Sequence, residues 1–363
     1  MRSFTVEERR ARLARRHFLA ESAASVDGLV ADLVGLHATD PATPYLSGWA
    51  RIPGFTVAEL DTELYERRTL LKHLAMRRTL WTVRAVDLPL IQSGASDRVA
   101  DNERRRLVAD AHKAGITDDG DAWLDTACAA VLRHLAEHGV ASAKELREAL
   151  PELAGRYDYA PGKRWGGETP LAPRVLTVLS VRGLIVRGPN DGAWTVSRPR
   201  WTPMSAWLPA AVDTVDPEVA RAEMVRRWLR TFGPATETDV KWWFGNTLTW
   251  ARHALRDIDA VAVDLDGTPG FALPDDLDVE PDVEPWCALL PGLDVTTMGW
   301  YGRDWYLGEH RSQLFDTNGN GGPTAWWNGR IVGGWGQDAD GRVEIRLLEN
   351  VGRDGTRALK RRA

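Results

Sequence analysis

Two consecutive helices are encoded by the stretch AWLDTACAAVLRHLAEHGVASAKELREAL, residues 122–150. Apolar residues of the first helix recur at intervals of three or four, as an amphipathic helix requires: Leu124, Cys128, Val131, Leu132 and Leu135. Ser142 followed by Glu145 forms the Ser-x-x-Glu pattern of a capping box, which predicts the start of the second helix. Further along, a third helix and two short strands are expected at 171–179, 184–186 and 194–196.

The same order of elements is expected in two more places. In the copy at 21–87, the second helix is expected at 27–36, and Thr56 with Glu59 is expected to cap another helix. The paired strands are expected at 69–74 and 79–84. In the last copy, Thr236 with Asp239 is the expected cap, and the third helix is expected to start near Thr247. The turn between its two strands is expected at Asp266-Gly267. Three helices followed by a two-stranded wing are typical of the winged helix, a helix-turn-helix variant that mostly binds nucleic acids. The repeat therefore favours DNA as the partner.

From Glu284 onward the pattern changes to short strands with tight turns. Asn328-Gly329 lies between two apolar pairs, which is a strong signal for a type I′ hairpin. Asp340-Gly341 precedes a further stretch of alternating apolar residues. Such strands predict a small β-barrel or a curled sheet. The expected fold class is therefore α+β, with three tandem winged-helix modules and a small C-terminal β-barrel.

The expected domain division follows these patterns. It comprises a first winged helix with the candidate site (1–92), a connector (93–121), a second winged helix (122–210) and a third winged helix (217–275). A β-barrel (284–350) and a short basic tail (351–363) follow. A segment at 156–168 is rich in glycine and aromatic residues, and we expect it to form an ordered loop inserted into the second module.

Composition limits the class of protein. The 363 residues are 44% hydrophobic and 27% charged, as in an ordinary globular protein. A net charge of −5 excludes a protein that coats DNA through its overall charge, although a local basic face remains compatible with DNA binding. No apolar run approaches the roughly 20 residues of a membrane span, and the N-terminus lacks the features of a secretory signal. We expect a cytoplasmic, nucleoid-associated protein whose two cysteines, Cys128 and Cys287, are reduced core residues.

Six phrases, spread over nearly the whole chain, resemble one known family. They are LVGLHATDPATPYLSGWAR (33–51), AMRRTLWTV (75–83), GPATETDVKWWFG (233–245), LLPGLDVTTMGW (289–300), RDWYLG (303–308) and LFDTNGNGGPTAWWNGRIVGGW (314–335). In these phrases the chain is similar to the AlkZ/YcaQ family of bacterial winged-helix proteins, whose characterised members are DNA glycosylases. The resemblance implies three winged helices in a C-shaped arrangement with a β-barrel. It also implies a monomer that removes alkylated bases from double-stranded DNA without a metal or other cofactor.

The candidate catalytic site departs from the family pattern. Where the family has Gln-apolar-Gln or Gln-apolar-Asp, this chain has His37-Ala38-Thr39. An N7- or N3-alkylated purine is already a cationic leaving group, so excision mainly requires a water molecule placed against the anomeric carbon. A neutral His37 can orient that water and accept its proton, Thr39 can hold it, and Asp40 is a substitute carboxylate. In the alternative interpretation, His37 caps a helix, Thr39 and Asp40 form a turn before Pro41, and nothing is catalysed.

Contacts to DNA are expected from residues in all parts of the chain. The arginines among them are Arg51, Arg77 and Arg78 beside the candidate site, and Arg174, Arg252 and Arg256 on third helices. Loop amides at Asn318 and Asn320 are candidates for the DNA backbone, and Trp327 is a candidate for stacking on a base. Two other functions compete with glycosylase activity. One is a catalytically inactive winged-helix regulator, and the other is a protein that sequesters damaged DNA or a genotoxin.

Overall fold

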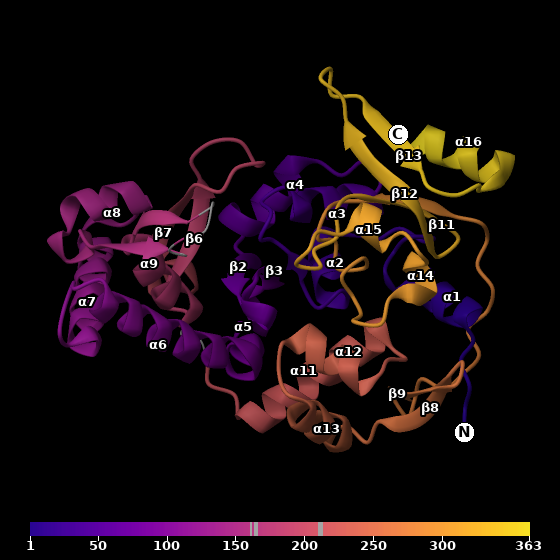
Figure 1. Ribbon diagram of the computed structural model, residues 1–363, viewed down its shortest axis with the longest axis horizontal. Coiled ribbons are helices and arrows are strands. Elements are labelled where there is room, and N and C mark those ends of the chain that lie inside the picture. Colours follow the sequence, from indigo (N-terminus) through magenta and orange to yellow (C-terminus); the bar gives the residue numbers. More distant parts are fainter. Residues whose placement is uncertain (160–161, 163–165, 210–212) are drawn as a thin grey trace.

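The computed structural model describes residues 1–159, 162, 166–209 and 213–363 (Figure 1). The first part (1–96) contains the helices α1 (Val6–Arg16), α2 (Val26–Asp32), α3 (Thr43–Arg51), α4 (Val57–Asp61) and α5 (Leu88–Ile91). Its antiparallel sheet has the order β1-β3-β2, formed by β1 (Leu36–His37), β2 (Leu70–Leu74) and β3 (Leu80–Arg84). The wing strands thus lie where they were expected. The capping pair is also present, because the backbone N–H of Thr56 donates to the Glu59 carboxylate at 2.9 Å.

The second part (97–209) is mainly helical. Its helices are α6 (Asp97–Lys113), α7 (Gly120–His138), α8 (Ala143–Ala149), α9 (Ala172–Val181) and α10 (Met204–Trp207), and its strand pairs are β4 (Arg156–Tyr159) with β5 (Gly167–Pro170) and β6 (Ile185–Asn190) with β7 (Pro199–Pro203). Ser142 caps α8 as expected, accepting from the Glu145 N–H at 3.2 Å. At the two ends of the loop expected at 156–168, the strands β4 and β5 pair as a hairpin. Residues 160–161 and 163–165 lie outside the described residues.

One strand of the second part differs from the expectation. The second wing strand was expected near 194–196, but β7 begins only at Pro199. The side chain of Asn190 explains the shift, because its amide donates to the carbonyls of Ala193 and Val196 at 3.0 and 2.8 Å. The same side chain accepts from the Arg198 N–H. These bonds satisfy the backbone of 193–198 as a compact loop, so ladder pairing starts after it.

The third part (213–275) follows the expected order of elements. It contains α11 (Pro217–Phe232), α12 (Glu237–Phe244), α13 (Leu248–Asp257), β8 (Val261–Leu265) and β9 (Thr268–Ala272). Thr236 accepts from the Asp239 N–H at 3.1 Å and Thr247 from the Trp250 N–H at 3.1 Å, so hydroxyl groups cap both α12 and α13. Asp266-Gly267 forms the turn between β8 and β9, with positive φ at both residues.

The C-terminal part (276–363) is an open sheet rather than the expected closed barrel. Its strands have the antiparallel order β10-β11-β12-β13, formed by β10 (Cys287–Leu290), β11 (Thr324–Trp327), β12 (Arg330–Gln337) and β13 (Val343–Leu347). Asn328 and Gly329 both have positive φ, as a type I′ hairpin requires. The remaining helices are α14 (Asp304–Leu307), α15 (Arg311–Leu314) and α16 (Gly352–Arg362). Within the described residues β10 and β13 do not pair, and α16 packs against β10 and β11 instead.

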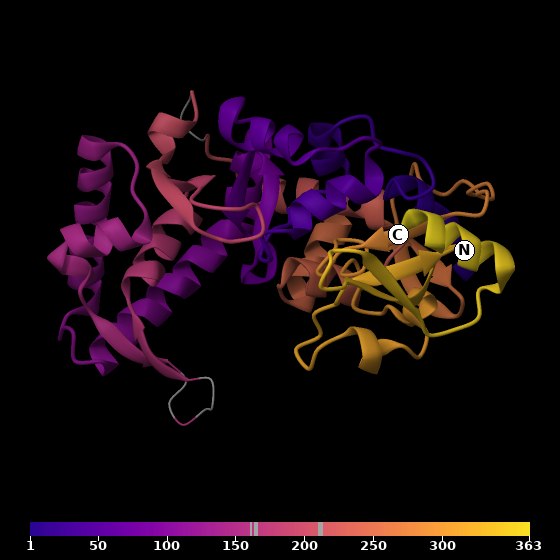
Figure 2. The ribbon, with the colours of Figure 1, turned by 90° about the horizontal axis from the view of Figure 1, so that it is seen from above.

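Two large clusters of buried apolar side chains organise these parts. One cluster joins the first, third and C-terminal parts with the end of the second, at Val186, Met204 and Trp207, and its largest members include Trp81, Trp228, Trp243 and Trp326. The other is confined to residues between Leu107 and Trp201 of the second part. Figure 2 shows the second part at one end and the C-terminal sheet with α16 at the other, where the N-terminus also lies. The division into winged-helix domains at the expected boundaries stays a prediction.

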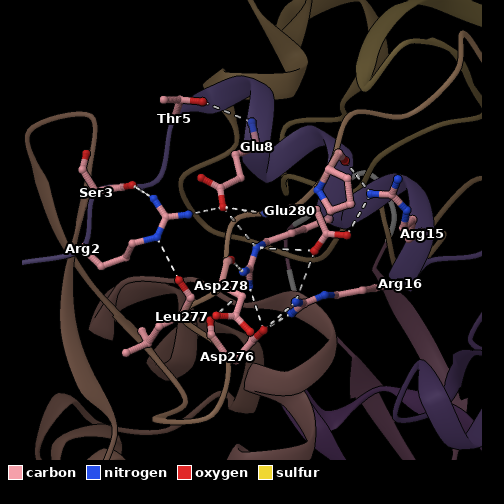
Figure 3. Close-up of polar contacts among 12 residues, drawn as sticks. Arg2, Ser3, Thr5, Glu8, Arg15, Arg16, Asp276, Leu277, Asp278 and Glu280 are labelled. Atoms are coloured by element: carbon pink, nitrogen blue, oxygen red, sulfur yellow. Dashed lines mark hydrogen bonds and ion pairs between the residues drawn. The ribbon is translucent and has the colours of Figure 1, made fainter.

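Arginines of the helix α1 form ion pairs with carboxylates of the same molecule (Figure 3). Arg12 and Arg16 contact the Asp276 carboxylate at 3.0 and 2.7 Å, and Arg15 contacts Glu280 at 2.9 Å. These pairs fix the segment between the third part and the C-terminal sheet against α1. Arg12, Arg15 and Arg16 are therefore already paired with carboxylates and are not a free basic surface for DNA.

Candidate active site

His37 lies at the end of the short strand β1. The strand pairs with β3 so that His37 is opposite Trp81, and the next N–H, of Ala38, donates to the Leu80 carbonyl at 2.7 Å. The His37 ring meets Trp81 edge to face, with centroids 5.2 Å apart, and its exposed fraction is only 4%. The ring nitrogen Nδ1 is buried and has no hydrogen-bond partner. The backbone is thus extended, as expected, but the side chain is enclosed rather than open on a surface.

The surroundings keep His37 neutral. Burial, together with the positive charge of Arg77, lowers the pKa of His37 to about 3, and the carboxylate of Asp294 only partly opposes these effects. A neutral imidazole has one nitrogen that accepts a hydrogen bond. His37 can therefore orient a water molecule at neutral pH, although it is a weak acceptor for a complete proton transfer.

Thr39 and Asp40 form an ordered turn at the surface beside His37. The Thr39 hydroxyl accepts from the Leu80 N–H at 3.1 Å, which leaves its own proton free to donate. The Asp40 carboxylate accepts from the Ala42 N–H at 2.9 Å and so orders the chain before α3. Both residues are exposed. This turn is the one that the alternative interpretation expects, while the hydroxyl of Thr39 remains available to a water molecule. The catalytic roles of His37, Thr39 and Asp40 stay predictions.

Arg51 is buried and does not fit the expected contact with DNA. Its side chain and that of Asp294 are both 0% exposed, and the two form a bidentate ion pair with N–O distances of 2.7 and 2.9 Å. Arg51 Nε also donates to the His17 carbonyl at 2.9 Å, and the Ser47 hydroxyl donates to Asp294 at 2.8 Å. We therefore correct the expected role of Arg51, which joins α3 to the segment after β10. The sequence analysis did not identify Asp294 as the partner of Arg51. The one indication of its importance was its place in the family-like phrase 289–300.

Of the other expected arginines, Arg78, Arg252 and Arg256 are exposed and Arg174 is half-buried, and most of these four are already paired. Arg78 is 55% exposed and contacts Glu103 at 2.8 Å, while Arg252 contacts Glu237 at 2.9 Å. Arg174 is half-buried and forms an ion pair with Asp110, and Arg256 is exposed on α13. DNA contacts by Arg78, Arg174 and Arg252 would require a phosphate to share or displace these carboxylates. Such contacts stay predictions.

The candidates for DNA contact in the C-terminal part already have partners within the protein. The backbone amides of Asn318 and Asn320 donate to the Asp316 carboxylate at 2.9 and 2.8 Å, so they are not free to approach a phosphate. Trp327 is half-buried beside α16, where a Cβ placed on Gly355 would lie 3.0 Å from the indole ring. The roles of Asn318, Asn320 and Trp327 in DNA binding stay predictions, although a carboxylate already holds the loop amides and α16 packs beside the ring of Trp327.

Stability is expected to fall steeply as the pH drops below about 6.5. His17, His37 and His73 are at most 4% exposed, and burial lowers their pKa values to about 3, 3 and 4. The unfolded chain, with ordinary histidine pKa values, therefore binds more protons than the folded chain between pH 6.5 and 4. Each histidine then removes about 1.4 kcal/mol of stability per pH unit. Urea denaturation at pH 7.5, 6 and 5 measures this loss, and equal stability at pH 7.5 and 5 would contradict the burial of these rings.

Comparisons with known proteins agree with this architecture. A family model described as DNA glycosylase AlkZ-like matches residues 30–363. Among solved structures, the fold is similar to Streptomyces sahachiroi DNA glycosylase AlkZ, with a TM-score of 0.77, 20% sequence identity and coverage of 99% of this chain and 95% of that chain. The search of curated proteins gave no match. In the described part of the chain, no helix has the length and apolar character that crossing a membrane requires.

Proposed function

We propose, from the premise that the chain belongs to the AlkZ-like DNA glycosylase family, that it is a monofunctional glycosylase excising N7- or N3-alkylated purines from double-stranded DNA. The observation that carries the proposal is the family match over 30–363, which includes the whole candidate site. His37 stands where the resemblance places the catalytic glutamine, and it belongs to β1, which pairs with β3.

The proposed reaction suits a neutral, weakly basic histidine. The bond between the sugar C1′ and the purine nitrogen breaks, and its electron pair neutralises the cationic base, which leaves. Water oriented by His37 attacks the resulting oxocarbenium-like C1′, and its proton passes to solvent. Because the leaving group needs no protonation, orientation of water by His37 and Thr39 is the main chemical contribution of the protein. Selectivity for damage then arises from the lability of the alkylated base and from distortion of the duplex.

A second candidate function is favoured by one observation. His37 is nearly enclosed, and Thr39 and Asp40 already serve the turn before α3, so the same structure fits a protein that binds DNA without cutting it. Such a protein would be a catalytically inactive regulator, or it would sequester damaged DNA or a genotoxin.

Incubation with a duplex carrying one N7-methylguanine separates these functions. The glycosylase should release free N7-methylguanine and leave an alkali-labile abasic site well above the spontaneous rate of a protein-free control. It should leave the undamaged duplex intact. Tight binding of the damaged duplex without release would contradict the enzyme and support sequestration. Preference for one undamaged sequence, again without release, would support a regulator.

A further inference from the structure

Arg77 is a cation without an acceptor in a largely desolvated place. Within the described residues its guanidinium makes no hydrogen bond and no ion pair, and its Nε is buried without a partner. Burial, together with the nearby charge of Arg303, lowers the pKa of Arg77 to about 9. A desolvated charge without a counter-charge is unfavourable, so this position is suited to a bound anion.

Arg77 belongs to a stack of alternating cations and aromatic rings. Its guanidinium carbon lies 4.2 Å from the centre of the Trp242 ring, and that of Arg303 lies 4.9 Å from the same ring. Arg303 also lies 4.9 Å from the Phe315 ring. It is 3% exposed and fixed by two hydrogen bonds to the Trp300 carbonyl, at 3.0 and 2.8 Å. Residues from the first, third and C-terminal parts thus position one guanidinium beside the candidate site.

The backbone at Arg77 is held in a strained conformation. Arg77 and Arg78 have φ values of 55° and 61°, which side chains other than glycine rarely adopt. The turn is held from two sides, because Arg78 contacts Glu103 on α6 and the end of α12 approaches Arg77 closely. That approach needs a glycine, since a Cβ on Gly245 would lie 3.0 Å from the Arg77 Cα. Contacts from two other parts of the chain therefore maintain the direction of the Arg77 side chain.

We propose that Arg77 binds one phosphodiester group of the DNA strand, next to the nucleotide that is excised at His37, and that Trp242 and Arg303 are positioning residues. This inference rests on the proposed function. Phosphate oxygens match the planar donors of a guanidinium, and they provide the negative charge that the described residues around Arg77 do not. The guanidinium carbon of Arg77 lies 5.9 Å from the centre of the Trp81 ring, and the His37 ring meets the same ring edge to face, so the bound phosphate would be close to the reacting sugar.

A scan with neutral phosphates tests the inference without requiring excision. The probe is a duplex with a tetrahydrofuran abasic analogue, in which single phosphates around the analogue are replaced in turn by methylphosphonate. With the wild-type protein, one position should weaken binding about 10-fold, as loss of a charge-assisted contact predicts. Arg77→Gln should bind the unmodified duplex about 10-fold more weakly and show no further loss at that position. The matched control Arg230→Gln removes an exposed arginine that pairs with Asp275, and it should keep the wild-type pattern.

The positioning roles have their own readout. Trp242→Leu should blunt the response to the critical methylphosphonate, and Trp242→Phe should restore it, whereas a purely structural role would change only thermal stability. Where Arg77→Gln does not fold, Arg77→Lys replaces it and should show a reduced response.

Two outcomes overturn the inference. One is a flat scan with the wild-type protein, and the other is an unchanged pattern in a folded Arg77 variant. A protein that excises N7-methylguanine but gives a flat scan contradicts this inference alone. A protein that binds no duplex contradicts the proposed function as well.

Discussion

Replacement of Asp294 by asparagine is expected to lower the free energy of unfolding by about 3–5 kcal/mol. Arg51 and Asp294 are both fully buried, and two parallel hydrogen bonds join them at 2.7 and 2.9 Å. Asparagine keeps the shape of the side chain but leaves the Arg51 cation buried without a counter-charge. Urea denaturation followed by tryptophan fluorescence measures the loss.

A matched pair at the surface provides the control. Arg230 and Asp275 form an exposed ion pair at 2.6 Å, and Asp275→Asn should leave the free energy of unfolding almost unchanged. Replacing both buried partners, as Arg51→Met with Asp294→Leu, should recover much of the stability lost in Asp294→Asn, because no unpaired charge remains. If Asp294→Asn were as stable as the wild type, the buried pair would not exist as described.

Local features of the fold follow from the sequence, while contacts between distant segments do not. The caps at Ser142 and Thr236 and the hairpin at Asn328-Gly329 depend on residues within a few positions of each other. The prediction of a closed barrel was wrong because the helix α16 packs against the edge strand β10, where the barrel would have to close. Leu359 of α16 is 1% exposed and packs against Leu289, Ala325 and Val332 of the sheet. The basic tail carries no strong apolar pattern from which this contact could be predicted.

The candidate site shows the same limit. The resemblance points to His37, but nothing in its phrase announces that Trp81 encloses the ring or that burial keeps it neutral. Arg51 looked like a surface cation because its partner lies 243 residues away. Arg77 was expected at the site, whereas Trp242 and Arg303 were missed, since a stack assembled from three parts of the chain leaves no spacing rule in the sequence.

The second large effect is expected at His37. His37→Ala should slow the excision of N7-methylguanine by about 100-fold or more, within the range that a positioned acid–base group contributes. His37→Gln should retain much of the rate, because an amide oxygen can also orient water. Since His37 is neutral well above its lowered pKa, the wild-type rate constant should stay nearly constant between pH 8 and 6.

The most direct test is the single-turnover rate constant for release of N7-methylguanine from a duplex, measured for the wild type and for His37→Ala. Thermal unfolding of both proteins should show that the variant is folded. The account predicts release by the wild type and a loss of at least about 100-fold in the variant. Equal rates in two folded proteins, or no release by the wild type, would contradict the assignment of His37 as the catalytic residue of a DNA glycosylase.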